Sequence, residues 1–184
     1  MVFLIISIVV ISVVGTLAHF LYDLSGHNKF IGLFAAVNES TWEHIKIALT
    51  PTLLWGLVDG FVYGSNPNYF FAKTISLIVI IVLMPLMFYG HKLVARKDYF
   101  VFDIISFYVV IIASQLAFYG LLQIAPVNFV VYYLSCVGMF AIFAGYMILT
   151  MMPMKNFIFK DPLTHKFGFK AHSEKFNIFK RKKK

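Results

Sequence analysis

Histidines and acidic residues gather at the ends of two apolar segments of this chain. His19 and Asp23 end the first segment, and His44 lies at the start of the second. A spacing of four residues places His19 and Asp23 on one face of a helix. Imidazole and carboxylate groups at close quarters are ligands that zinc and similar divalent metals use in proteins. We therefore predict a site here for a small cation, a phosphate headgroup or a divalent metal such as zinc, with His19, Asp23 and His44 as candidate metal ligands.

Glu39 and Glu43 flank the start of the second apolar segment, and either carboxylate could act as general base beside a metal-bound water. His27 continues the four-residue spacing of His19 and Asp23, but Ser25–Gly26 should unwind the helix before it. Polar residues are also expected at any membrane boundary without forming a site. Two hypotheses stay open: a binding or transport-type protein that recognises a small ion or an anionic lipid headgroup, and a metal-dependent hydrolase of a lipid or membrane-embedded substrate. An accessory subunit is a third.

The composition indicates which solvent surrounds the elements that carry these residues. Of 184 residues, 60% are hydrophobic and only 13% are charged, which is more apolar surface than a water-soluble core of this size can bury. A helix needs about 20 mainly apolar residues to cross a bilayer. The sequence therefore predicts an all-α integral membrane protein with five transmembrane helices, near residues 2–23, 41–64, 69–93, 99–122 and 128–152.

Lysine and arginine residues predict which ends of the helices face the cytoplasm. Residues 1–152 carry six Lys/Arg and six Asp/Glu, whereas the rest of the chain carries ten Lys/Arg and two Asp/Glu, which accounts for the net charge of +8. The Lys/Arg residues of the connections near 24–40 and 91–98 lie on the same side as this tail, and cytoplasmic loops retain such residues. We predict a transmembrane domain over 1–152 with its N-terminus outside, a basic aromatic cytoplasmic tail over 153–184, and a multi-pass location in a bacterial cytoplasmic (inner) membrane.

The tail mixes phenylalanines with lysines and ends in the basic run Lys180–Lys184. Each surface Lys or Arg contributes about 1 kcal/mol to binding an anionic leaflet, and aromatic rings insert at headgroup level. Basic and aromatic residues also occur in single-stranded nucleic-acid sites, but a tail held at the membrane meets anionic lipid first. We expect membrane lipids as partners, with anionic headgroups contacting the tail, and no nucleic acid.

Two charged residues and three glycines lie inside the predicted helices. Asp59 and Lys73 lie about one turn from the outer ends of neighbouring helices, so we predict a structural ion pair, with an ion or proton pathway as the alternative. Gly56, Gly60 and Gly64 fall on one stripe, where small residues let another backbone approach closely. The stripe predicts helix packing within the chain, with homodimerisation as the alternative.

The connection near 24–40 is apolar for a loop and ends in a helix-start motif. A solvated loop does not need residues such as Phe30 and Phe34, so this connection is expected to lie re-entrant or interfacial and to cover a cavity. Ser40 and Glu43 have the spacing of a capping box, in which each side chain accepts a hydrogen bond from the backbone N–H of the other. The motif predicts a helix start at about residue 41.

Three stretches, Gly15–Asp23, Gly32–Lys46 and Phe159–Gly168, together resemble an uncharacterised family of small bacterial membrane proteins. The most specific part is Asn-Glu-Ser-x-Trp-Glu-His-x-Lys over residues 38–46, here called the signature motif. The resemblance implies a role beyond topology for six of its residues: Asn38, Glu39, Trp42, Glu43, His44 and Lys46. Of these, we take Asn38, Trp42 and Lys46 as candidate binding residues. The family has no established activity, and His165 stands where the resemblance leads us to expect a glycine.

Overall fold

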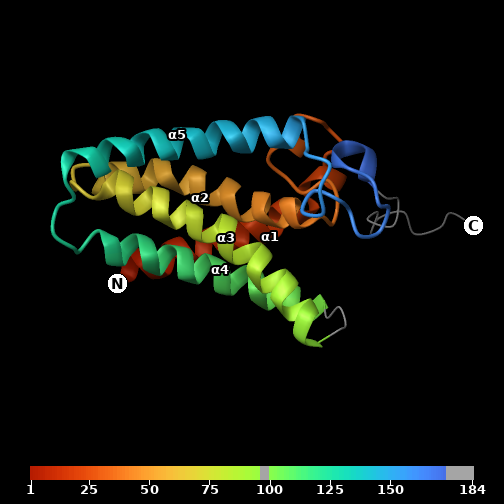
Figure 1. Cartoon of the computed structure of the whole chain (residues 1–184), viewed down its shortest axis with the longest axis horizontal. Helices are drawn as coiled ribbons and strands as arrows, with labels where there is room; N and C mark the ends of the chain where they lie inside the picture. The colour runs from red at the N-terminus through yellow and green to blue at the C-terminus, as the bar shows by residue number, and fades with distance from the viewer. Residues whose placement is uncertain (96–99, 173–184) are drawn as a thin grey trace, which may run out of the picture.

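Five long α-helices form a bundle in which consecutive helices run in alternating directions (Figure 1). The computed structural model describes residues 1–95 and 100–172. All five helices are long and apolar enough to cross a membrane, which confirms the predicted fold class, and their ends fall within two residues of the predicted ones. They are α1 (Val2–Leu24), α2 (Thr41–Tyr63), α3 (Tyr69–Ala95), α4 (Phe100–Leu121) and α5 (Phe129–Met151).

The polar part of the chain collects at one end of the bundle, where α1, α3 and α5 end and α2 and α4 begin; we call it the polar end (Figure 1). The connection between α1 and α2, with the short 3-10 helix η1 (Ile31–Leu33), lies there. So does the C-terminal segment, residues 153–172, which contains the 3-10 helix η2 (Gly168–Ala171). The rest of the predicted basic tail, 173–184, lies outside the described residues, as do residues 96–98 of the connection between α3 and α4.

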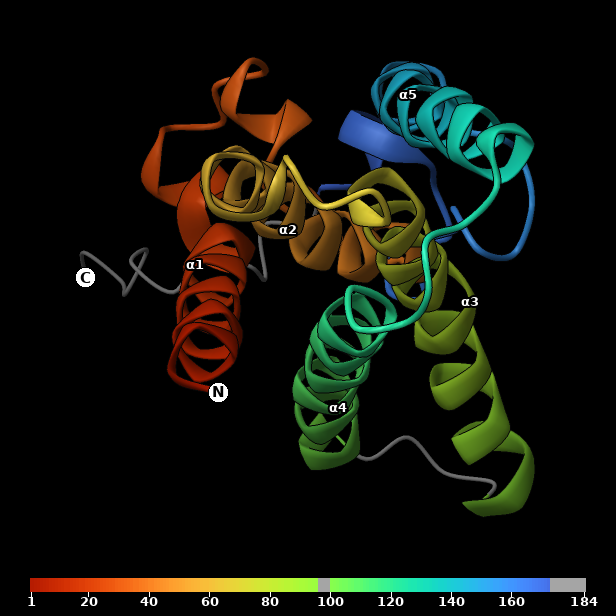
Figure 2. The same cartoon turned by 90° about the vertical axis from the view of Figure 1, so that its left-hand side faces the viewer.

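Helix α3 is the centre of the packing, because it contacts α2, α4 and α5. Helix α1 packs on α2 and α4, and α5 packs on α3 and on η1. Seen from the end, α2 and α3 lie between α1 and α5 (Figure 2). Helix α5 is therefore joined to the bundle mainly through α3 and the α1–α2 connection.

Helices α1 and α2 pack closely against each other at Gly15. A Cβ atom at Gly15 would lie 2.7 Å from the carbonyl oxygen of Ile47 and 2.6 Å from the ring of Phe107. Pro51 lies four residues after Ile47 and lacks an N–H, so it cannot donate the helical hydrogen bond to the Ile47 carbonyl. The glycine thus lets α1 pack directly on backbone that the proline has freed.

The predicted glycine stripe of α2 accommodates side chains and not another backbone. A Cβ atom at Gly56 would lie 3.1 Å from Lys73 Cε, and one at Gly60 would lie 3.4 Å from the hydroxyl of Tyr69, both from α3. Gly64 is the residue that caps the end of α2. The close helix approach that we expected at this stripe lies at Gly15 instead.

Asp59 of α2 and Lys73 of α3 form an ion pair inside the bundle, near the end opposite the polar end. Both side chains are buried, and the ammonium group also lies 4.7 Å from the centre of the Phe118 ring of α4. A buried ion pair with good geometry satisfies charges that the membrane interior would otherwise disfavour. The pair connects α2 to α3 beside the glycine stripe.

The connection between α1 and α2 folds back into the bundle. Three helix side chains bind its consecutive carbonyl groups: Lys46 Nζ donates to Gly32 O at 2.8 Å, Tyr146 Oη to Leu33 O at 2.8 Å, and Thr50 Oγ1 to Phe34 O at 3.0 Å. Thr50 lies nine residues into α2, so the connection reaches roughly 13 Å along that helix. Non-helical backbone at this depth must be satisfied by the protein itself, and these three side chains do so.

Candidate functional site

Asn38 and Trp42 of the signature motif bind the C-terminal segment. The backbone N–H of Trp42 donates to the carbonyl of Ile158 at 3.0 Å, and its indole stacks on Phe159 with ring centres 4.8 Å apart. The side-chain amide of Asn38 donates to the carbonyl of Gly168 at 3.1 Å. Both residues are buried. They attach the C-terminal segment to the polar end.

Glu43 and Lys46 form a buried ion pair at 2.6 Å. Glu43 Oε2 also accepts from the backbone N–H of Val37 at 3.0 Å, which joins α2 to the α1–α2 connection. Ser40 is the N-cap residue of α2, as predicted, but the capping box is wrong: Ser40 makes no side-chain cap bond, and its N–H donates to Asn38 Oδ1 at 2.8 Å. The Glu43 carboxylate binds the Lys46 ammonium and the Val37 N–H in place of the Ser40 N–H, because those two groups lie beside it in the buried interior.

The remaining ionisable residues of the motif, Glu39 and His44, meet His19 of α1; we call these three residues the Glu39 cluster. His19 Nε2 lies 3.7 Å from Glu39 Oε1, and His44 Nε2 lies 3.9 Å from Glu39 Oε2. His44 Nδ1 lies 3.0 Å from the carbonyl of Ser40. A carbonyl only accepts hydrogen bonds, so His44 Nδ1 carries a proton and Nε2 is the ring nitrogen that faces the carboxylate.

Burial raises the pKa of the Glu39 carboxyl above its usual value. His44 opposes this shift, whereas the negative charges of Asp161, Asp103 and Glu43 add to it. Asp161 also fixes the residue, because Asp161 Oδ1 accepts from the backbone N–H of Glu39 at 3.0 Å. Glu39 lines a surface pocket of about 180 Å³ at the polar end. Its side chain is 24% exposed, so most of it is shielded from water while part of it can be reached from outside.

A second group, here called the Asp23 cluster, consists of Asp23, His27 and His172. One ligand atom from each residue lies within 4.8 Å of the other two. His27 Nε2 is 3.2 Å and His172 Nε2 is 3.1 Å from Asp23 Oδ1. Asp23 is almost fully buried, whereas the His27 side chain is 43% exposed. Two imidazoles and a carboxylate thus converge on one point that solvent can reach from the His27 side.

The contact of His172 with a backbone carbonyl indicates which of its two ring nitrogens carries a proton. His172 Nδ1 lies 3.0 Å from the carbonyl of Val37, so Nδ1 carries a proton. In the neutral ring Nε2 is then a lone pair directed at a carboxylate oxygen 3.1 Å away. In addition, Asp23 Oδ2 is buried and has no hydrogen-bond partner within residues 1–95 and 100–172. The arrangement needs a proton or a metal cation between these groups.

A change of backbone direction brings His27 to Asp23. Helix α1 ends at Leu24, as the Ser25–Gly26 pair predicted, but the chain then turns with positive φ values of 68° at Gly26 and 65° at His27. His165 has φ 59°, so the histidine that stands where we expected a glycine occupies the left-handed region that glycine favours. The turn returns the His27 ring to the face of α1 that carries Asp23.

The structure divides the predicted metal ligands between the two clusters. His19 and His44 meet at Glu39, whereas Asp23 lies with His27 and His172. His172 was not a sequence candidate, because it lies far along the chain from Asp23 and belongs to no spacing pattern. Only the docking of the C-terminal segment brings it there.

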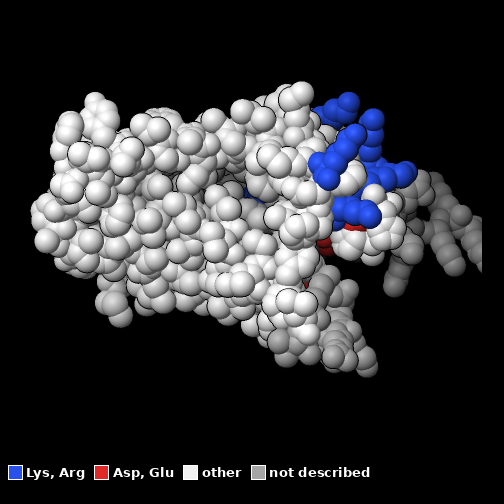
Figure 3. Space-filling model, viewed as in Figure 1, with Lys and Arg blue, Asp and Glu red and all other residues white. Residues whose placement is uncertain are grey.

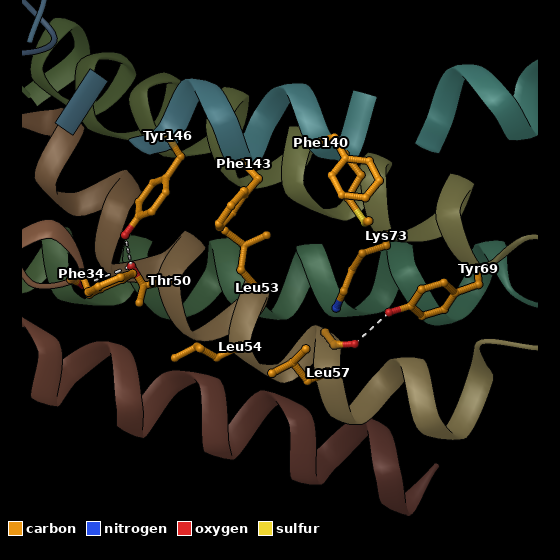
Figure 4. Close-up of a pocket in the computed structure, with 12 residues that line it drawn as sticks. Phe34, Thr50, Leu53, Leu54, Leu57, Tyr69, Lys73, Phe140, Phe143 and Tyr146 are labelled. Atoms are coloured by element: carbon orange, nitrogen blue, oxygen red, sulfur yellow. Dashed lines mark hydrogen bonds between the residues drawn. The ribbon is translucent and has the colours of Figure 1, made fainter. Parts of the chain in front are cut away.

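A groove of about 330 Å³ runs between α2 and α5 within the spans (Figure 4). Phe140 and Phe143 of α5 point into it towards α2, and Lys73 reaches it from α3 (Figure 4). Its other walls are almost wholly apolar. A continuous row of ion ligands, which an ion pathway needs, is not present among the described residues that line it.

The chain belongs to a family of unknown function, DUF6512, whose model matches residues 1–169. No curated protein and no solved structure matches the chain. The match covers all five spans and most of the described C-terminal segment, and it ends three residues before His172.

Proposed function

We propose that this member of the family is a multi-pass membrane protein that binds one divalent transition-metal ion at the Asp23 cluster. The observation that carries the proposal is the contact of His172 Nε2, whose ring is protonated at Nδ1, with the Asp23 carboxylate, whose side chain is 7% exposed. A metal ion satisfies both groups at once. Imidazole and carboxylate ligands suit zinc best among the common cellular divalent ions.

The distances support this ligand set. Ligand atoms that share a tetrahedral zinc ion at about 2.0–2.1 Å lie roughly 3.3 Å apart. Asp23 Oδ1 lies 3.2 Å from His27 Nε2 and 3.1 Å from His172 Nε2. The hydrogen bond from His172 Nδ1 to Val37 O is the outer-shell contact that fixes the tautomer and ring orientation of metal-binding histidines. The cluster therefore needs little rearrangement to hold an ion.

A metal-dependent hydrolase of a lipid or membrane-embedded substrate is the second candidate function. The observation that favours it is that three protein ligands leave a fourth position for water, and that the exposed side of His27 opens to solvent. The zinc-loaded protein is then expected to hydrolyse a lipid ester in mixed micelles, and His27→Asn is expected to abolish the reaction. Equal turnover by His27→Asn would refute this candidate.

We further propose that the polar end faces the cytoplasm of a bacterial inner membrane and contacts anionic headgroups. Its surface carries a group of basic side chains (Figure 3). They include four exposed lysines of the C-terminal segment: Lys155, Lys160, Lys166 and Lys170. Basic residues next to a span favour the cytoplasmic side and attract anionic lipid.

Metal binding is tested by titrating zinc into the EDTA-treated full chain in detergent, purified through a tag without histidines. The chain offers a matched pair, because His27 and His165 both have positive φ, a region that asparagine tolerates. His27→Asn should remove one equivalent of bound zinc, with an affinity loss on the order of 100-fold or more, since loss of an outer-shell partner alone costs 10- to 100-fold. His165→Asn should bind zinc as the wild type does. Equal binding by the two variants would refute the proposal.

A further inference from the structure

We infer that the groove between α2 and α5 binds one acyl chain of an ester lipid from the leaflet opposite the polar end, and that the ester carbonyl accepts a hydrogen bond from Lys73. The inference goes beyond the proposed function, because the groove and the Asp23 cluster share no residue. The alternatives are a second copy of this chain seated in the groove, and a groove that bulk lipid fills without selection.

The groove opens to the lipid side of the bundle. Leu54 and Leu57 of α2 are 55% and 68% exposed, and Phe140 and Phe143 of α5 are 65% and 47% exposed. All four line the groove (Figure 4). Helix α5 packs on α3 and on η1, and a space of about 330 Å³ stays open between it and α2. A mainly apolar lining of this volume is typical of a site for a small apolar ligand, and the bilayer supplies lipid chains from the side.

The hydroxyl groups that line the groove already have partners within the protein. Those of Thr50 and Tyr146 lie 2.7 Å apart, and each also contacts a carbonyl of the α1–α2 connection. The Tyr69 hydroxyl donates to Gly56 O at 2.9 Å. These three groups therefore have no proton left for a ligand.

Lys73 differs from these hydroxyls, because an ammonium group has three N–H donors. One donates to Asp59, and the centre of the Phe118 ring lies 4.7 Å from Nζ, where the ring face attracts a second. Among residues 1–95 and 100–172, no further acceptor contacts this ammonium group. The third N–H is thus free for an oxygen atom of a ligand.

The absence of a side chain at Gly56 brings Lys73 to the groove. A Cβ atom at this position would lie 3.1 Å from Lys73 Cε and 3.7 Å from Nζ. The Lys73 side chain is only 2% exposed, so its ammonium group serves the groove and not the lipid at large. An ester carbonyl is uncharged, which suits a lysine whose charge Asp59 already balances. A phosphate or a free carboxylate would add a second anion to this buried pair.

The depth of Lys73 fits the position of a lipid ester. Lys73 lies four residues after the start of α3, about 6 Å along the helix from the end opposite the polar end. Lipid esters lie where the hydrocarbon core meets the headgroups. From Leu57 to Thr50 the groove follows α2 for seven residues, about 10 Å, towards the polar end. Half of the core is about 15 Å thick, so the groove accommodates most of one acyl chain of that leaflet.

Two lipids that differ only in the ester carbonyl test the inference. Diester and diether phosphatidylglycerol with identical chains are added to the full chain in dodecyl maltoside micelles, which contain no ester, and native mass spectrometry measures binding. We expect one diester molecule per chain and an affinity for the diether lipid about 10-fold or more lower, since a hydrogen bond to a charged donor is lost. The double variant Asp59→Asn/Lys73→Met removes both charges of the pair and should bind the two lipids equally.

Leu57 and Leu134 provide a matched pair of variants. They are 68% and 66% exposed, and of the two only Leu57 lines the groove. Crosslinking by a diester probe with a diazirine within its acyl chain should saturate at one probe per chain. Leu57→Trp should lower this crosslinking because the larger side chain fills the groove, whereas Leu134→Trp should leave it unchanged.

Equal affinities of the wild-type chain for diester and diether lipid overturn the inference, and so does an ester preference that persists in the folded double variant. Crosslinking that rises without saturation, or that the two tryptophan variants change alike, overturns it in favour of bulk lipid. In a Cys136→Ser background, a Leu57→Cys chain that forms a disulfide-linked dimer and binds no lipid overturns it in favour of a second copy. Should the double variant not fold, the wild-type comparison and the matched pair decide: saturable, ester-dependent binding that Leu57→Trp alone weakens supports the inference.

Discussion

Replacement of Lys46 by methionine should destabilise the fold strongly, and removal of its partner in the same chain should restore much of the loss. Lys46 is fully buried, pairs with Glu43 at 2.6 Å and donates to Gly32 O at 2.8 Å. Lys46→Met leaves the Glu43 carboxylate, itself 3% exposed, without its cationic partner and with the hydrogen bond from the Val37 N–H. Removal of one partner of a buried pair costs about 3–5 kcal/mol. The unfolding equilibrium constant should rise between about 100-fold and several thousand-fold.

The double variant Glu43→Gln/Lys46→Met removes both charges. It retains the cost of an unsatisfied Gly32 carbonyl, about 1–3 kcal/mol, and should therefore be more stable than Lys46→Met alone. Reversible unfolding in mixed micelles with increasing SDS, followed by tryptophan fluorescence, measures all four corners of the cycle. A double variant that is less stable than Lys46→Met would refute the reasoning, because the buried charge would then not be the source of the loss.

Three further predictions concern packing, orientation and metal release. Gly15→Ala should lower stability by about 1–3 kcal/mol because its Cβ would overlap the Ile47 carbonyl. Gly120→Ala, whose Cβ would have nothing within 4 Å, should be neutral or stabilising, and equal stabilities of the two variants in the SDS assay would contradict this. In a Cys136→Ser background, Lys166→Cys should react with a membrane-impermeant maleimide in inverted vesicles but not in intact cells, and the reverse result would place the polar end outside. Acidification should release zinc, because ligating imidazoles must be deprotonated; dialysis at pH values below neutral with metal analysis checks this, and zinc retained under acid would contradict imidazole ligation.

The spans could be predicted from sequence because hydropathy depends on composition within one segment. Lipid accepts apolar side chains on all faces of a helix, so no partner is needed to recognise a span. Close contacts between helices do depend on partners. Gly56, Gly60 and Gly64 have the regular spacing that predicts close packing of backbones, yet Gly15 is the glycine that lies against backbone of a neighbouring helix, where Pro51 frees the Ile47 carbonyl. No local pattern contains that information.

The candidate site was predictable in location but not in pairing. Polar residues at the ends of α1 and α2 correctly indicated a polar end, since such residues are disfavoured inside the spans. The pairing of Asp23 with His27 depends on two successive positive φ values, and its pairing with His172 depends on the docking of a segment more than a hundred residues away. Both are tertiary effects that spacing along the chain does not encode.

The signature motif shows why presence in a motif does not by itself identify a functional residue. Asn38, Trp42 and Lys46 have partners that match their chemistry, namely carbonyl groups, an aromatic ring and a carboxylate, and they bind the α1–α2 connection and the C-terminal segment. Glu39 and His44 instead contact each other and His19 with partly exposed side chains, outside these buried contacts. Variants of the first three residues should therefore lose stability, whereas Glu39→Gln, whose side chain is 24% exposed, should remain folded. If Glu39→Gln destabilised the protein as strongly as Lys46→Met, the division between the buried structural residues of the motif and its partly exposed residues would not hold.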